Sequence, residues 1–172
     1  GNPILLSGGE VYTALERGNI DATEWVGPLH DVRFGLDRAA KFYYYPGWHE
    51  PSTQLELIIN KTAWESLPAH LQTIIANTAS ATGVQLHARM EVENSKAYAK
   101  LRESGHVELI PFPHDVLAAL HASAKDALDD EAAKDESFRA VRANYEAFRE
   151  IFDAWDDITE DAYREYLNRA QE

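Results

Sequence analysis

The sequence contains no cysteine, which excludes structural disulfides, thiolate nucleophiles and metal sites built on cysteine. No apolar run approaches the roughly 20 residues that a membrane-spanning helix requires. The sequence also lacks a glycine-rich phosphate-binding loop, a G-x-S-x-G nucleophile elbow and an HExxH zinc motif. These absences weaken the case for an enzyme, and they leave the cellular compartment open.

Positive charge is scarce, because 16 Lys and Arg residues face 29 Asp and Glu residues, for a formal net charge of -13. A surface of this sign repels nucleic-acid phosphates and anionic lipid headgroups, so we exclude nucleic acid and membrane surfaces as partners. An anionic ligand meets the same repulsion and needs a local cation, which is either an arginine or a bound metal ion. The hydrophobic fraction of 45% is sufficient for the core of one average-sized domain.

Hydrophobic patterning predicts an α/β chain with a helical C-terminal third. Short apolar runs predict strands at residues 4–6, 19–22, 55–59 and 107–110, with a turn at Gly8-Gly9. A helix is expected from Ser66 toward Glu103, with Gly105 ending it. The last long helix carries an apolar seam at steps of three and four residues, formed by Phe138, Val141, Tyr145, Phe148, Phe152 and Trp155.

Glu24 and Trp25 follow the predicted strand at residues 19–22, a position where open α/β sheets carry ligand groups. The Glu24 carboxylate can coordinate a hard cation, and the Trp25 indole can pack on an organic ligand. A salt bridge at the end of the strand and an ordinary core tryptophan explain the same two residues. On spacing alone, this second interpretation is the commoner one.

His49 and Glu50 follow Trp48 after a Pro-Gly turn, as half of a metal site or as an acid–base pair. No second histidine lies at ligand spacing from His49, so the pair alone does not indicate catalysis. The run from Tyr43 to Tyr45 is typical of a strand, on which side-chain alternation directs only some of the rings toward a pocket.

Two ordered blocks carry a more specific pattern: G-E-V-Y-T-A-L-E-R-G-N-I-D-A at residues 9–22 and L-I-I-N-K-T-A-W-E-S-L-P at residues 57–68. They resemble the stretches E-V-Y-T-A-L-x-x-G-x-x-D and v-i-N-k-x-x-W-x-x-L-P of DctP-type solute-binding proteins of tripartite ATP-independent periplasmic (TRAP) transporters. The segment E-W-V-G-P at residues 24–28, with the later Y-Y-Y-P-G-W and Glu50, resembles the subgroup that binds 2-oxo acids or lactate.

In that subgroup a sodium or calcium ion bridges the protein and the substrate. The resemblance implies that Glu24 gives a carboxylate oxygen to the ion and that Trp25 gives its backbone carbonyl. It implies Glu50 as a further contact to the metal or the substrate, and Trp48 and Tyr45 as residues of the pocket wall. Such an ion also supplies the local cation that an anionic ligand needs.

The family has two lobes around a cleft, a periplasmic-binding-protein-like fold of class II type, and its N-terminal part supplies an arginine that clamps the substrate carboxylate. Nothing in this sequence corresponds to that part, so we expect a C-terminal fragment that, on its own, binds its ligand weakly or not at all. Residues 1–50 are expected mostly in the second lobe, with a strand crossover, and residues 51–92 in the first lobe. Residues 93–172 are expected to return to the second lobe and to form the long C-terminal helices.

The resemblance thus implies a periplasmic binding protein, not an enzyme, that delivers a small organic acid to the TRAP membrane subunits. The C-terminal seam resembles a segment that some members exchange in homodimers. Two alternatives from other classes remain open: a metal-dependent hydrolase or lyase using Glu24, His49 and Glu50, and a dimerisation module without a ligand.

Overall fold

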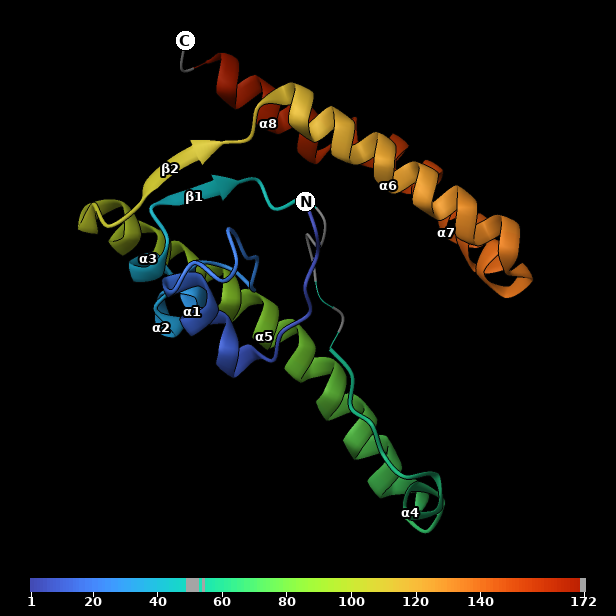
Figure 1. Ribbon diagram of the computed structural model, residues 1–172. Helices are drawn as coiled ribbons and strands as arrows, with labels where there is room; N and C mark the ends of the chain where they lie inside the picture. Colours follow the sequence, from blue (N-terminus) through green and yellow to red (C-terminus); the bar gives the residue numbers. More distant parts are fainter. Residues whose placement is uncertain (49–52, 54, 171–172) are drawn as a thin grey trace. The chain divides into compact units, whose positions relative to one another are not determined.

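The computed structural model describes residues 1–48, 53 and 55–170, which form two compact units, Gly1–Phe112 and Pro113–Glu172. The first unit contains α1 (Gly8–Glu16), α2 (Pro28–Phe34), α3 (Leu36–Ala39), β1 (Phe42–Tyr45), α4 (Lys61–Glu65), α5 (Ala69–Ser104) and β2 (Glu108–Pro111) (Figure 1). The second unit contains α6 (His114–Lys134), α7 (Glu136–Asp156) and α8 (Glu160–Arg169).

The strands β1 and β2 pair in parallel, with Phe42 opposite Glu108 and Tyr45 opposite Pro111. The backbone N–H of Phe112 extends the ladder by donating to the carbonyl of Tyr45 at 2.7 Å. The connection between the two strands contains α5, which is the helical crossover that a parallel pair requires. The predicted α/β class is therefore confirmed, as a mostly helical chain with a small parallel sheet, and β2 confirms the strand predicted at residues 107–110.

Three other predicted strands are wrong, since residues 4–6, 19–22 and 55–59 lie in no strand. At residues 19–22 the cause is local, because the N–H groups of Asn19 and Ile20 donate to the Ala14 carbonyl at the end of α1, at 2.8 and 3.3 Å. Leu5 and Ile58 are exposed, and in the described ranges the sheet consists of β1 and β2. An extended apolar segment becomes a strand only where another strand pairs with it.

The predicted turn at Gly8-Gly9 is also wrong, because both glycines begin α1. The helix starts there because the Glu10 carboxylate accepts hydrogen bonds from the Ser7 hydroxyl at 2.6 Å and from the Ser7 N–H at 3.3 Å. This arrangement satisfies polar groups at the first turn, as a capping box does. The helix then buries Val11 and Ala14 on one face.

The core of the first unit is small, and α2 packs along α5. Its buried apolar side chains are Val11 and Ala14 of α1, Leu36 of α3, and Ala97 and Leu101 of α5. The helix α5 has 36 residues and ends where predicted, because Gly105 adopts the left-handed conformation at φ 63°. None of the helices in the described part of the chain is long and apolar enough to cross a membrane.

The second unit is helical, as the sequence predicts, and specific polar contacts join α6 to α7. Arg142 of α7 forms an ion pair with Asp129 of α6 at 2.7 Å. Arg139 of α7 donates to the Ala132 carbonyl of α6 at 3.2 Å. The Asp135 side chain begins α7 by accepting a hydrogen bond from the Phe138 N–H at 2.9 Å.

The end of α5 gives a test of backbone conformation with its own control. Replacing Gly105 by Ala is expected to lower the free energy of unfolding by roughly 1–2 kcal/mol, because an L-residue resists the left-handed region. Replacing Gly83, an exposed residue inside the same helix, by Ala is expected to raise it by up to about 1 kcal/mol, because Ala favours helix. No atom lies within 4 Å of a Cβ added at either position. Urea unfolding measures both values, and shifts of the same sign would contradict this account of the helix end.

Candidate functional site

Residues 24–27, here called the 24–27 loop, directly precede α2 in the connection from α1 and carry Glu24 and Trp25. The Trp25 indole stacks on Phe34 of α2, with ring centroids 4.9 Å apart. Its edge lies against Gly8 at the start of α1, where an added Cβ would come within 3.0 Å of Cη2. Phe34 thus covers one face of the indole. A ligand could contact only the part of Trp25 that remains exposed, and the residue is 37% exposed.

Asp31 of α2 ties the 24–27 loop to the sheet through a buried carboxylate that is 8% exposed. Its Oδ1 accepts a hydrogen bond from the Gly27 N–H at 3.2 Å, and its Oδ2 accepts one from the Tyr43 hydroxyl at 2.6 Å. Burial raises the pKa of Asp31, whereas the hydrogen bonds from Tyr43, Gly27 and Val26 lower it. Burial and the adjacent Asp31 raise the pKa of Tyr43, so its hydroxyl remains a donor.

A third contact reaches the loop from α5. The Leu29 N–H donates to the Asn94 side-chain oxygen at 3.0 Å. The same amide lies beside Gly27, since an added Cβ at Gly27 would make an ordinary van der Waals contact with its oxygen at 3.5 Å. Gly27 has φ 149°, which L-residues rarely adopt, so this position requires glycine. Contacts from α1, β1 and α5 therefore fix the loop and the start of α2.

The aromatic run alternates as expected for a strand. Tyr43 turns toward α2 and reaches Asp31. Tyr44 stacks on Phe112 with ring centroids 5.0 Å apart, and Phe42 lies 6.5 Å from Tyr44 by the same measure.

Of the remaining residues predicted for the site, two lie in the described part of the chain and two do not. Tyr45 and Trp48 are exposed, and their role in a pocket wall stays a prediction. His49 and Glu50 lie outside the described residues.

Glu24 and the Trp25 carbonyl are oxygen donors of the kind that calcium prefers, and both belong to one exposed loop. Across residues 1–48, 53 and 55–170, no three His, Asp or Glu side chains gather into a metal-binding cluster. Calcium takes about six to eight oxygen ligands. The pair therefore fits as part of an oxygen shell, which needs backbone oxygens, ligand oxygens or Glu50 to complete it.

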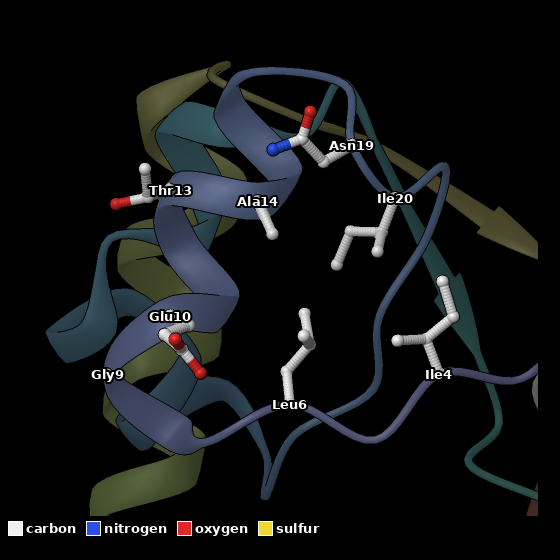
Figure 2. A pocket seen from close by; sticks show the side chains of 8 residues that line it. All are labelled: Ile4, Leu6, Gly9, Glu10, Thr13, Ala14, Asn19 and Ile20. Atoms are coloured by element: carbon white, nitrogen blue, oxygen red, sulfur yellow. The ribbon is translucent and has the colours of Figure 1, made fainter.

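An open hollow of about 440 Å³ lies between the N-terminal segment and α1 (Figure 2). Figure 2 shows the side chains of Ile4, Leu6 and Ile20 directed into this space. The described residues that line it are Ile4, Leu6, Gly9, Glu10, Thr13, Ala14, Asn19 and Ile20. Glu10 is the one charged residue among them, so these residues offer no cation to a carboxylate ligand, and we do not assign the acid site to the hollow.

Reasoning from the sequence missed Gly8, Asp31, Tyr43 and Asn94 as residues that support the loop. Asp31 and Tyr43 are 12 positions apart, and Leu29 and Asn94 are 65 positions apart. Periodicity describes one helix or strand at a time and carries no signal for such pairs. The one usable signal was the alternation of the aromatic strand, which predicts that some tyrosine turns inward.

The family model described as bacterial extracellular solute-binding protein, family 7 (DctP), matches residues 1–135. A protein of Nostoc sp. named a monocarboxylate 2-oxoacid-binding periplasmic protein is 36% identical over 170 residues, which are 99% of this chain and 46% of that protein. An uncharacterized protein of Haemophilus influenzae is 33% identical over 116 residues, which are 63% of this chain and 32% of that protein. The chain spans less than half the length of these curated relatives.

Two solved structures are similar to the chain, each with a TM-score of 0.90. A TRAP transporter solute-binding protein from Bordetella bronchiseptica, 30% identical, is a mixed-occupancy dimer that has a site with copurified calcium and picolinate and an apo site. A TRAP periplasmic solute-binding protein from Colwellia psychrerythraea, 33% identical, has bound calcium and pyruvate. They match 98% and 95% of this chain and 50% of their own chains.

Two neighbouring glycines test the packing of Trp25. Replacing Gly8 by Ala is expected to lower the free energy of unfolding by about 1–3 kcal/mol, because the new Cβ meets the rigid indole at 3.0 Å. Replacing Gly9 by Ala is the matched control, since nothing lies within 4 Å of its Cβ and alanine favours the helix. Thermal unfolding and tryptophan fluorescence report the two effects. Equal stability of the two variants would show that Trp25 does not pack on Gly8.

Proposed function

The chain belongs to the bacterial extracellular solute-binding protein family 7, the DctP family of TRAP transporter binding proteins, and we propose that it serves in a periplasmic receptor for a small monocarboxylate. A 2-oxo acid or lactate is the proposed ligand. The observation that carries this proposal is the 24–27 loop, which presents Glu24 and the Trp25 carbonyl from a backbone fixed by three elements. The two solved relatives with calcium and an organic acid support it.

We propose that the Glu24 carboxylate and the Trp25 carbonyl hold a calcium or sodium ion, with Glu50 as a third contact. The bound ion supplies the positive charge that the acid's carboxylate requires. The Trp25 indole, Tyr45 and Trp48 form the pocket wall in this proposal, and Glu50 also contacts the substrate. Calcium in both solved relatives supports calcium over sodium.

The net charge of -13 supports a bridging ion rather than direct capture of the acid. A carboxylate of the protein repels the carboxylate of the ligand. A site lined by acidic oxygens therefore attracts the ligand only when a cation lies between the two groups. The bound acid is not altered in this proposal, because reversible binding breaks no covalent bond. Glu24 therefore acts as a ligand here and not as a general acid or base.

The hydrolase or lyase alternative is not favoured. The family is a transport family rather than an enzyme class. Of its three proposed catalytic residues, His49 and Glu50 lie outside the described residues, so the structure adds no geometry in its favour. In this proposed transport role, the partners of the protein are the TRAP membrane subunits, which accept the acid.

The C-terminal helices support a second proposed partner, another copy of the chain. Six large apolar side chains of α7 are 51–72% exposed: Val141, Tyr145, Phe148, Ile151, Phe152 and Trp155. Exposed apolar surface of this extent is typical of a protein–protein interface. We propose that this exposed seam packs in a homodimer, as the dimeric Bordetella relative supports.

The lobe boundaries belong to the same proposal. Residues 1–50 would lie mostly in the second lobe, residues 51–92 in the first, and residues 93–172 in the second again. The compact units meet at Phe112 and Pro113, a division that does not test these boundaries.

The proposed ion site is tested by Glu24→Gln in the full-length protein. The unaltered protein is expected to bind pyruvate more tightly with calcium than without it, and to leave pyruvate unconsumed. The variant is expected to lose at least about tenfold in calcium affinity, because an amide oxygen lacks the ligand charge. Isothermal titration calorimetry measures both affinities.

The matched control for this test is Glu103→Gln, which removes one negative charge from an exposed residue of α5. It is expected to bind calcium and pyruvate as the unaltered protein does. Equal losses in both variants would mean that net charge, and not a site at Glu24, attracts the cation.

The proposed dimer is tested by placing a charge in the seam. Phe148→Glu is expected to convert a dimer to a monomer at micromolar concentration, because a carboxylate would be buried unpaired at the interface. Ala143→Glu, on the opposite side of α7, is the control and is expected to remain dimeric. Sedimentation velocity distinguishes the species, and a monomeric unaltered protein would reject the interface.

A further inference from the structure

We infer that Asp31 and Tyr43 are positioning residues for the proposed ion site, because together they set the backbone from which Glu24 and Trp25 present their oxygens. This inference rests on the proposed function and extends it to residues that contact neither the ion nor the acid. The Tyr43 hydroxyl fixes the Asp31 carboxylate at 2.6 Å, and that carboxylate fixes the Gly27 N–H at 3.2 Å. Gly27 is only two residues from Trp25.

The two oxygens of Asp31 divide the task between two elements. One oxygen faces β1 and the other faces the 24–27 loop, so the carboxylate fixes the loop relative to the sheet. The Gly27 amide thus points at one buried side chain, which orients the peptide plane next to the one that carries the Trp25 carbonyl.

The choice of a carboxylate at this position is informative because burying a charge is unfavourable. An apolar side chain of similar size would join α2 to β1 without that penalty. It would not orient the Gly27 amide, since only a hydrogen-bond acceptor has a preferred direction. The buried charge is therefore better explained by the loop geometry than by stability.

Glycine at position 27 makes an external constraint necessary. Its φ of 149° is open to glycine, and glycine also has more alternative conformations than other residues. On one side Asn94 restrains Leu29, and on the other Phe34 and Gly8 restrain the Trp25 ring. Asp31 acts on the backbone between those two points. Fixing ligand groups through such supporting hydrogen bonds is a general requirement of metal sites.

The test compares Tyr43→Phe with Tyr44→Phe in the full-length protein. Each removes a single hydroxyl from β1, but only Tyr43 reaches Asp31, whereas the exposed Tyr44 ring stacks on Phe112. Tyr43→Phe is expected to weaken calcium binding at saturating pyruvate by about 10- to 100-fold. Tyr44→Phe is expected to bind as the unaltered protein does.

A second readout needs no calcium. In the ion-free protein, hydrogen exchange at the amides of Val26 and Gly27 is expected to accelerate by about tenfold in Tyr43→Phe, while exchange in the interior of α5 keeps its rate. Asp31→Asn is expected to have a similar effect, since one of its two acceptor oxygens becomes an amide donor. Combining both substitutions should add little, because both act on one hydrogen-bonded unit.

The outcomes separate the inference from the proposed function. If the unaltered protein binds calcium and pyruvate and Tyr43→Phe binds them equally well, the inference is wrong and the proposed function stands. If exchange accelerates equally in α5, Tyr43 only stabilises the fold and the inference is again wrong. If the unaltered protein binds neither calcium nor pyruvate, the proposed function fails and the inference fails with it.

Discussion

The buried carboxylate of Asp31 is the interaction on which the candidate site depends. It accepts hydrogen bonds from Tyr43 of β1 and from Gly27 of the 24–27 loop, so it connects the sheet, α2 and the loop through one side chain. Burial raises its pKa, and the hydrogen bonds from these donors oppose that rise. If the carboxylate were removed, the 24–27 loop would lose its link to β1 and would rest on the packing of the Trp25 ring and on the contact of Leu29 with Asn94.

The net charge of the chain supports the proposed role of this loop. A chain with a net charge of -13 repels organic acids, yet it belongs to a family of extracellular solute-binding proteins whose solved members hold calcium together with picolinate or pyruvate. In the proposed site, the oxygen donors of the protein bind a cation, and the positive charge of that cation attracts the acid. The same acidic residues that would repel a carboxylate then become the means of binding it.

Much of the helical structure was predictable because its signals are local. Gly105 ends α5, and the steps of three and four between Phe138 and Trp155 mark a face of α7. The sequence blocks at residues 9–22 and 57–68 also indicated the family that the comparisons show. Strands were harder, since residues 4–6 and 55–59 have the apolar composition of strands but a strand forms only with a partner. The candidate residues Glu24 and Trp25 were predicted from the end of a strand at residues 19–22 that does not form and from the resemblance to the family. The contacts of Asp31 and Asn94 depend instead on packing between distant segments.

The central claim, an ion site at the 24–27 loop, is tested most directly by terbium luminescence. Terbium(III) accepts the same oxygen ligands as calcium, and a neighbouring indole sensitises its emission. The account predicts sensitised emission that calcium competes away and that Trp25→Phe combined with Trp48→Phe largely abolishes, since the two substitutions remove both indoles of the proposed pocket and keep the Trp25 carbonyl. Emission that persists unchanged in the double variant would place the ion elsewhere and contradict the account.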